Sequence, residues 1–128
     1  NEKLRNGYPL DELNQSFIKD FDEVLNKLQD YQGKVLRDLY LYSDTIAEFM
    51  NDYIVGNTIS FNQYLSSTTL SSYNDKTNVR YYIKSLSGKD LRYFNMNEME
   101  ILFARETKFK ITSIKFNDII EIYMEEVE

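Results

Sequence analysis

Residues 98–111 read EMEILFARETKFKI, and this stretch decides the fold that we expect. Two short apolar runs, 100–103 within the stretch and 108–114 starting in it, have the length and the aromatic and β-branched content of strands. A third strand is predicted over 119–124, because Asn117-Asp118 before it is typical of a tight turn. The C-terminal part of the chain is therefore predicted to form a β-sheet.

The residues before this stretch are predicted to begin with helices. Apolar side chains recur there three and four positions apart, which places them on one helix face. The expected buried face of the first helix consists of Leu10, Leu13, Phe17, Phe21, Val24 and Leu28. The further predicted elements are helix 10–28, strand 35–42, helix 44–53 capped by Ser43, strand 79–84 and a turn at 87–90. Helices first and strands afterwards is an α+β order, in one domain over 1–128.

The composition excludes several classes of function. The chain has 128 residues, 42% hydrophobic and 28% charged, which fits one globular domain. With no His and no Cys, Ser-His-Asp catalysis, thiol nucleophiles and His- or Cys-bound zinc are excluded. The 15 Lys and Arg against 21 Asp and Glu disfavour nucleic-acid binding, and no apolar run approaches the roughly 18 residues of a membrane span. Any catalysis must therefore use carboxylates, Arg, Lys, Tyr and hydroxyls.

Three local features are candidates for chemistry. Arg37 lies inside an apolar strand, and a guanidinium can hold phosphates through paired hydrogen bonds. The hydroxyl run 66–69 can orient a carboxylate, and Glu98 and Glu100 share one face if the strand already includes Glu98. Two close carboxylates can divide acid and base roles. Taken alone, each feature also has a structural interpretation: an exposed arginine, a strand end or helix cap, and a solvated charge pair.

The order of these features resembles the mono-ADP-ribosyltransferase family, in the branch with Arg, Ser-Thr-Ser and Glu-x-Glu motifs that contains many bacterial toxins. Arg37 matches the arginine, and FNQYLSST at 61–68 matches the hydroxyl motif with its aromatic lead-in. Residues 98–111 match the catalytic glutamate strand and its Arg-x-Thr-Lys-Phe-like turn. YIVGNTI at 53–59 resembles the stretch before the hydroxyl motif, so that the resemblance covers nearly the whole chain.

The resemblance implies an ADP-ribosyltransferase-like α+β fold, with two roughly perpendicular antiparallel β-sheets around an NAD cleft and N-terminal helices. It implies that Arg37 grips NAD and that Ser66 braces the catalytic glutamate and the nicotinamide ribose. Glu100 is expected to bind a ribose hydroxyl and to stabilise the cationic ribose of the transition state. Glu98 matches the glutamate that engages the acceptor, and Glu rather than Gln there implies an arginine acceptor. NAD is the expected substrate, and no metal is expected.

Further residues are candidates for contacts with NAD. Ser67 follows Ser66 in the hydroxyl motif and is expected to help bind NAD. Phe61 and Tyr64 are candidates to shape the nicotinamide pocket, and Tyr73 is a candidate to close over bound NAD. For each aromatic residue, packing in the core or on the surface is the alternative.

The sequence departs from the family pattern in two places. Asp38 stands where the family usually has Gly, and its carboxylate could pair with Arg37 and compete with the NAD phosphates. The hydroxyl motif reads Ser-Ser-Thr in place of Ser-Thr-Ser, which keeps every hydroxyl.

The implied function is transfer of ADP-ribose from NAD to an arginine of a target protein, for which actin or a small GTPase would fit. The implied source is a bacterial toxin or effector that is secreted and acts in the cytoplasm of a target cell, as a monomer. The alternatives are an NAD glycohydrolase, in which water replaces the acceptor, and an inactive partner-binding module of the same fold. Because residues 1–5 resemble the middle of the family's N-terminal helical region, the chain is expected to be an N-terminally truncated fragment.

Overall fold

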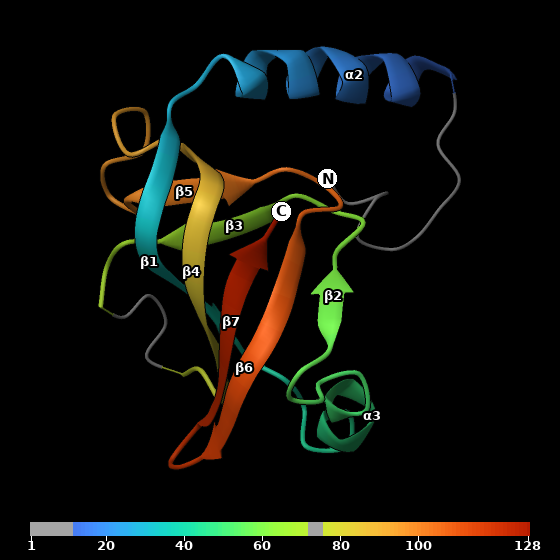
Figure 1. Ribbon diagram of the computed structural model, residues 1–128, viewed down its shortest axis with the longest axis vertical. Coiled ribbons are helices and arrows are strands. Elements are labelled where there is room, and N and C mark those ends of the chain that lie inside the picture. The colour runs from blue at the N-terminus through green and yellow to red at the C-terminus, as the bar shows by residue number, and fades with distance from the viewer. Residues whose placement is uncertain (1–11, 72–75) are drawn as a thin grey trace.

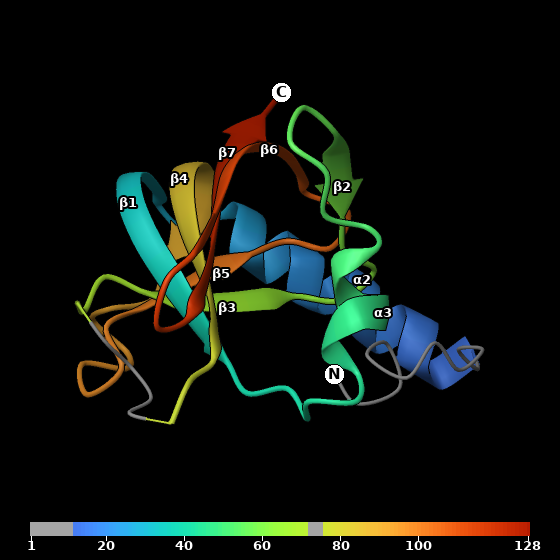
Figure 2. The same cartoon turned by 90° about the horizontal axis from the view of Figure 1, so that it is seen from below.

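The computed structural model describes residues 12–71 and 76–128. Its elements in chain order are α2 (Glu12–Asn26), β1 (Asp30–Leu39), α3 (Ile46–Met50), β2 (Thr58–Ser60), β3 (Leu65–Thr68), β4 (Val79–Asp90), β5 (Glu100–Phe103), β6 (Lys108–Phe116) and β7 (Ile120–Val127). Figure 1 and Figure 2 place α2 over one end of the strands and α3 at the opposite end. Among the described residues, no helix combines the length and the apolar content needed to cross a membrane.

The strands of the described residues hydrogen-bond in the order β1-β3-β5-β4-β7-β6-β2, and β1 also pairs with β4. Figure 1 shows β3 and β5 running across β4, β6 and β7, so that two groups of strands cross each other. The expected α+β fold with crossing strands is therefore confirmed. Two details differ from separate antiparallel sheets: the groups are joined through β1 and β4, and β4 pairs with β7 in parallel. The residues between β4 and β7 are long enough for this crossover, because β5 and β6 lie within them.

The main core takes its residues from both groups of strands. On β4, Val79, Tyr81 and Ile83 are at most 3% exposed, as the predicted alternation requires. The other buried members of this cluster are Val35, Tyr53, Leu65, Ile101, Phe103, Phe109, Ile111, Ile122 and Met124. Because β3 and β5 contribute to this core from one face, their other face is left for α2.

The predicted buried face of the first helix is confirmed only in part. Phe21 and Leu28, both predicted, are partly buried and pack against the cluster that contains Ile18 and Leu25. Ile18 and Leu25 are buried, whereas Phe17 and Val24 are 65% and 56% exposed. The two sets lie only one position apart along the helix, and both fit a spacing of three and four. Packing against the β3–β5 pair selects between them, and the periodicity of one helix carries no information about that choice. Of the other predicted positions, Leu10 and Leu13 lie outside the described side chains.

The turn predicted at 87–90 is wrong, since β4 continues to Asp90. A Cβ on Gly88 would lie 2.7 Å from the Ile101 side chain and 2.7 Å from the Ser85 hydroxyl, closer than atoms in contact can be. Gly88 is therefore the position at which β5 crosses close over β4. The last residues of β4 then pair with β5, so that the glycine serves close approach and not chain reversal.

The other predicted elements are present with shifted ends. Strands 100–103, 108–114 and 119–124 correspond to β5, β6 and β7, and the strand predicted from 35 begins earlier, at Asp30. The second helix is shorter than 44–53. The residue at its N-cap position is Thr45 and not Ser43, and the Thr45 side chain donates or accepts no capping hydrogen bond.

A polar contact links α2 to Tyr64, the residue directly before β3. The Tyr64 hydroxyl donates to the Asp22 carboxylate over 2.6 Å, and the Tyr64 ring packs edge-on against Phe21 with 5.0 Å between ring centroids. Arg105 donates to the other Asp22 oxygen over 3.3 Å. Burial, and next the Asp22 carboxylate, raise the pKa of Tyr64 to about 12, because both disfavour the phenolate.

Replacement of Tyr64 by Phe tests this link. Tyr64→Phe should lower the free energy of unfolding at pH 7 by about 1 kcal/mol, because Asp22 then lacks its phenolic donor. A pKa that is raised in the folded state contributes stability below the unfolded pKa of about 10, and this contribution is lost as the pH rises toward 12. Urea unfolding at several pH values should therefore show the difference from wild type shrinking between pH 10 and 12. Tyr93→Phe, at a tyrosine that is 86% exposed, is the control and should change neither quantity.

Candidate active site

Ser66 on β3 joins two of the predicted site residues. Arg37 on β1 donates from Nη1 to the Ser66 carbonyl oxygen over 3.1 Å. The Ser66 hydroxyl donates to Oε2 of Glu100 over 2.5 Å. Three residues that lie on three separate strands therefore meet at one point, and the contact of Ser66 with Glu100 is one that the resemblance implied.

The register of the strands explains this meeting. β3 and β5 are antiparallel, with Ser66 opposite Leu102 and Thr68 opposite Glu100. Residues opposite each other or two apart share a face, so Glu100 is the diagonal neighbour of Ser66. β1 and β3 are antiparallel and pair at Leu36 with Thr68, so Arg37 comes to the level of Ser67, from where its guanidinium reaches the carbonyl oxygen of the adjacent Ser66.

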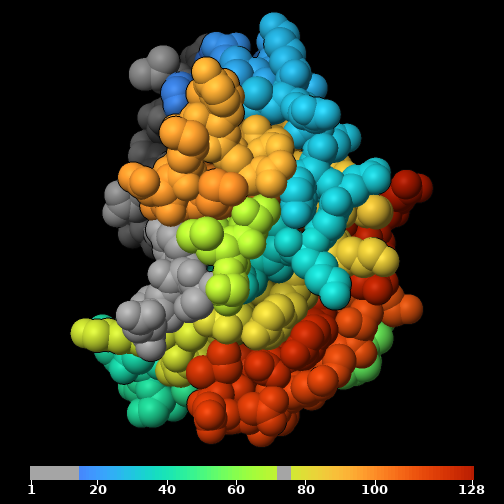
Figure 3. All heavy atoms as spheres, turned by 90° about the vertical axis from the view of Figure 1, so that its left-hand side faces the viewer, coloured from blue at the N-terminus to red at the C-terminus, as the bar shows by residue number. Residues whose placement is uncertain are grey.

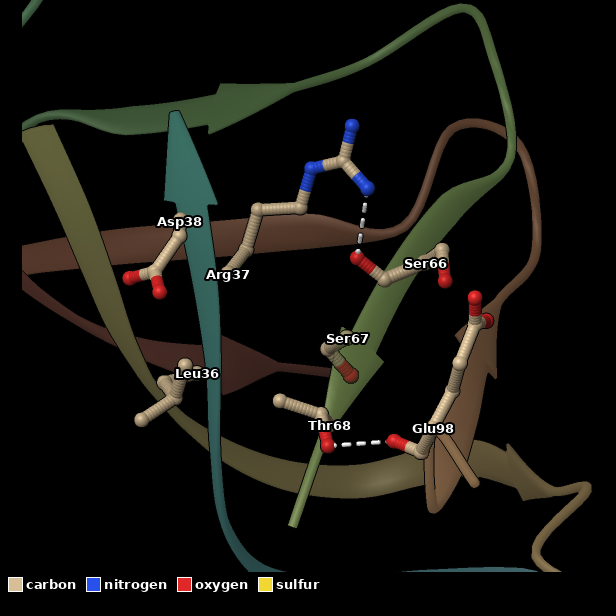
Figure 4. Close-up of a pocket in the computed structure, with 7 residues that line it drawn as sticks. All are labelled: Leu36, Arg37, Asp38, Ser66, Ser67, Thr68 and Glu98. Carbon is tan, nitrogen blue, oxygen red and sulfur yellow. Dashed lines mark hydrogen bonds between the residues drawn. The ribbon is translucent and has the colours of Figure 1, made fainter. Parts of the chain in front are cut away.

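A pocket lies directly beside these contacts. It encloses about 310 Å³, a volume that includes space open to solvent. Its lining residues are Leu36, Arg37, Asp38, Ser66, Ser67, Thr68 and Glu98. Figure 4 shows the guanidinium of Arg37 and the carboxylate of Glu98 extending toward Ser66 from opposite sides. A cation, an anion and a hydroxyl-bearing residue thus line one pocket.

Glu98 is placed by a turn and not by the strand. β5 begins at Glu100, as predicted, so the strand does not include Glu98 and the two glutamates do not share a strand face. Met99 between them has a φ of 47°, in the left-handed region, which breaks the strand alternation there. The Thr68 hydroxyl donates to the Glu98 carbonyl oxygen over 2.5 Å, and the Thr69 amide donates to the Met99 carbonyl over 3.1 Å. The end of β3 therefore holds the backbone of this turn.

Asn95 also belongs to the site, and sequence reasoning missed it. Its side-chain Nδ2 donates to Oε2 of Glu98 over 2.9 Å and lies 3.4 Å from Oε1 of Glu100. An asparagine between two strands is ordinarily explained as a turn residue, so the sequence carried no signal for this contact.

Solved structures share this architecture. The chain aligns with the ADP-ribosyltransferase HopU1 of Pseudomonas syringae pv. tomato DC3000 at a TM-score of 0.77 and 21% identity, over 92% of this chain and 56% of that one. The chain has an ADP-ribosyltransferase-like fold. It also aligns with the ADP-ribosyltransferase Vis of Vibrio splendidus in complex with agmatine, at a TM-score of 0.70 and 22% identity, over 90% of this chain and 58% of that one.

A third similar structure is exoenzyme S from Pseudomonas aeruginosa, in complex with human 14-3-3 protein beta and bound to Carba-NAD. Its TM-score is 0.76 at 18% identity, over 98% of this chain and 64% of that chain. This chain therefore spans little more than half the length of the solved structures that it matches. No protein-family model and no curated protein matches the sequence.

Asp38 has a structural partner in this ADP-ribosyltransferase-like fold. Its carboxylate accepts from Arg80 Nε over 2.5 Å and from Arg80 Nη2 over 3.3 Å, and its side chain is fully buried. Asp38 lies opposite Arg80 in the β1–β4 ladder, and the carboxylate raises the pKa of the Arg80 guanidinium. Figure 4 shows Arg37 and Asp38 pointing to opposite sides of β1. The structure thus pairs Asp38 with Arg80, whereas the sequence suggested a competitor for Arg37.

The aromatic candidates have packing partners in the structure. Phe61 packs against Tyr81 and Phe109, with 6.0 Å between ring centroids in each pair. Tyr64 lies under α2 with its hydroxyl on an aspartate, as described above. Neither residue lines the pocket beside Arg37, so the structure supports the packing alternative for both. Tyr73 lies outside the described residues.

Ser67 lines the pocket, but its hydroxyl hydrogen-bonds to the neighbouring strand β5. It is 5% exposed and donates to the Ile101 carbonyl oxygen over 2.7 Å. Of the two serines in the motif, Ser66 is therefore the one whose hydroxyl reaches a carboxylate of the site.

Replacement of Asp38 by Asn tests its assignment. Asp38→Asn should lower the free energy of unfolding by about 2 kcal/mol, because the largely buried Arg80 loses its counter-charge. Affinity for NAD, measured by calorimetry on the folded variant, should change by less than about threefold, because the carboxylate points away from Arg37. Asp118→Asn, at an exposed turn, is the matched control and should stay within about 0.5 kcal/mol of wild type. Strong tightening of NAD binding in Asp38→Asn would show that Asp38 competes for Arg37 after all.

Proposed function

We propose that the protein transfers ADP-ribose from NAD to an arginine of a target protein. The observation that carries the proposal is the linkage of Arg37, Ser66 and Glu100 by two hydrogen bonds, at a pocket that Glu98 also lines. The ADP-ribosyltransferase-like fold supports it, since a structure of that fold is bound to Carba-NAD.

The residues of the pocket fit the parts of NAD. A guanidinium suits its phosphates through paired hydrogen bonds, and the hydroxyl and carboxylates suit its ribose hydroxyls. Because the pocket is open to solvent, a ligand that is larger than the pocket can extend out of it. Bound NAD supplies a ribosyl group whose nicotinamide leaves readily, because the ring nitrogen carries a positive charge.

Each residue then has a distinct task. Arg37 binds the phosphate end and fixes the orientation of the dinucleotide. Glu100, held by Ser66, presents a carboxylate to the ribose and stabilises the positive charge that develops there in the transition state. Since Ser66 already fixes the carboxylate, little reorganisation is needed when that charge forms.

Glu98 supports arginine as the acceptor. A guanidinium is a weak nucleophile because it is almost always protonated, and a carboxylate beside it can orient it and help to remove a proton. Glu98 lines the same pocket as Arg37 and Ser66, so an incoming guanidinium would meet it next to the ribose. The structure of Vis with agmatine, itself a guanidinium compound, also favours this acceptor class.

The loop between β4 and β5 supports a protein as the acceptor. It carries Tyr93, Phe94 and Met96, which are 86%, 72% and 71% exposed, directly before Glu98. Figure 3 shows this loop, in orange, projecting beside β3, in yellow-green. Exposed aromatic and Met side chains at the edge of a site are typical of a surface that binds a protein.

Since Vis is a toxin, we further propose secretion by a bacterium and action inside a target cell.

Incubation with labelled NAD and a eukaryotic lysate tests the proposal. The wild-type chain should label one or a few proteins, and mass spectrometry should locate ADP-ribose on arginine. Glu100→Gln should reduce labelling by at least about 100-fold, because a neutral amide stabilises the developing charge poorly. Glu106→Gln, at an exposed glutamate after β5, is the matched control and should label normally. NAD cleavage without labelling would favour the glycohydrolase, and neither activity would favour an inactive partner-binding module.

Replacement of Glu98 by Gln separates transfer from hydrolysis. Glu98→Gln should reduce transfer to agmatine by about 100-fold, since the acceptor loses its base, while NAD hydrolysis stays within about threefold of wild type. Both rates come from one assay that quantifies nicotinamide release and ADP-ribosyl-agmatine. Equal loss of both would contradict the assignment of Glu98 to the acceptor.

A further inference from the structure

The loop that carries Glu98 consists of two successive turns that meet at Asn95. The amide of Asn95 donates to the Leu91 carbonyl over 3.0 Å and closes the first turn. The Asn95 carbonyl accepts from the amides of Glu98 and Met99, over 3.3 Å and 2.9 Å, and opens the second. The backbone of Asn95 therefore sets the path by which the chain enters the site.

The side chain of Asn95 contacts both glutamates. Its NH₂ group has two donors, and these face Glu98 Oε2 at 2.9 Å and Glu100 Oε1 at 3.4 Å. Two carboxylates this close repel each other when both are ionised. A neutral donor between them offsets part of that repulsion and leaves both charges in place for the substrate.

The two glutamates depend on Asn95 to different degrees. Glu100 belongs to the β5 ladder, and the Ser66 hydroxyl binds its other oxygen over 2.5 Å. Glu98 lies on the turn before Met99, whose φ is in the left-handed region. Of the two glutamates, Glu98 is the one closer to the Asn95 side chain, at 2.9 Å against 3.4 Å for Glu100. Loss of the Asn95 amide should therefore displace the Glu98 carboxylate more than the Glu100 carboxylate, which Ser66 still binds.

We propose that Asn95 is a positioning residue that holds Glu98 against Glu100 and thereby determines how much ADP-ribose passes to the acceptor and how much to water. The inference rests on the proposed function. Asn95 does not touch the reacting atoms. It acts through Glu98, whose carboxylate must meet the guanidinium of the acceptor at the ribose.

Three variants of the full chain test this role, with agmatine as acceptor. Asn95→Ala should lower kcat for transfer about tenfold through misplacement of Glu98, while KM for NAD and the rate of NAD hydrolysis stay within about threefold of wild type. Asn95→Asp keeps the shape but replaces the donors by a third carboxylate, so transfer should fall further than in Asn95→Ala. Asn97→Ala, at an exposed asparagine of the same loop, is the matched control and should behave as wild type.

The outcomes separate this role from the alternatives. A lower ratio of transfer to hydrolysis in both Asn95 variants, with unchanged thermal unfolding, supports the positioning role. An unchanged ratio overturns it, and so does equal loss of transfer and hydrolysis, which would mean that Asn95 acts through Glu100 or through the fold. Wild-type protein that cleaves no NAD would instead overturn the proposed function, and this inference with it.

Discussion

The arrangement of the site depends on the two-sided contact of Ser66. Its carbonyl accepts from Arg37 and its hydroxyl donates to Glu100, so one residue of a four-residue strand links β1 to β5. Among the described residues, β1 and β3 pair at a single position. The ladder is therefore short beside Ser66, and a carbonyl that a longer ladder would engage is available to the guanidinium. The same interaction joins the strands and orients the side chains.

The two glutamates illustrate two ways to hold a carboxylate. Glu100 lies in a β-ladder, and a hydroxyl from the neighbouring strand donates to its carboxylate. Glu98 lies on a turn whose backbone is held by Thr68 and whose side chain is held by Asn95. A fixed carboxylate suits a charge that always forms at one place. A carboxylate on a loop suits a partner that arrives from solution.

Particular residues show how far the sequence could be interpreted. The alternation from Val79 to Ile83 and the apolar run at 100–103 each predicted a strand correctly, because both patterns depend on local geometry alone. Gly88 was misinterpreted as a turn, because the reason for a glycine there is the crossing of another strand 13 residues further along the chain. Part of the face of α2 was misassigned for a related reason, since only the neighbours of the helix distinguish Ile18 from Phe17.

By itself, the sequence determined the α+β order and most of the helices and strands, because residue type and spacing carry that information directly. The roles expected of Arg37, Ser66, Glu98 and Glu100 came from the resemblance to a known family. The tertiary structure alone decided that the Ser66 carbonyl accepts from Arg37, that Asp38 pairs with Arg80, and that Asn95 joins the two glutamates. Hydrogen bonds between side chains extend over about 3 Å and require defined angles. Such contacts depend on how strands far apart in the chain cross, which no local pattern encodes.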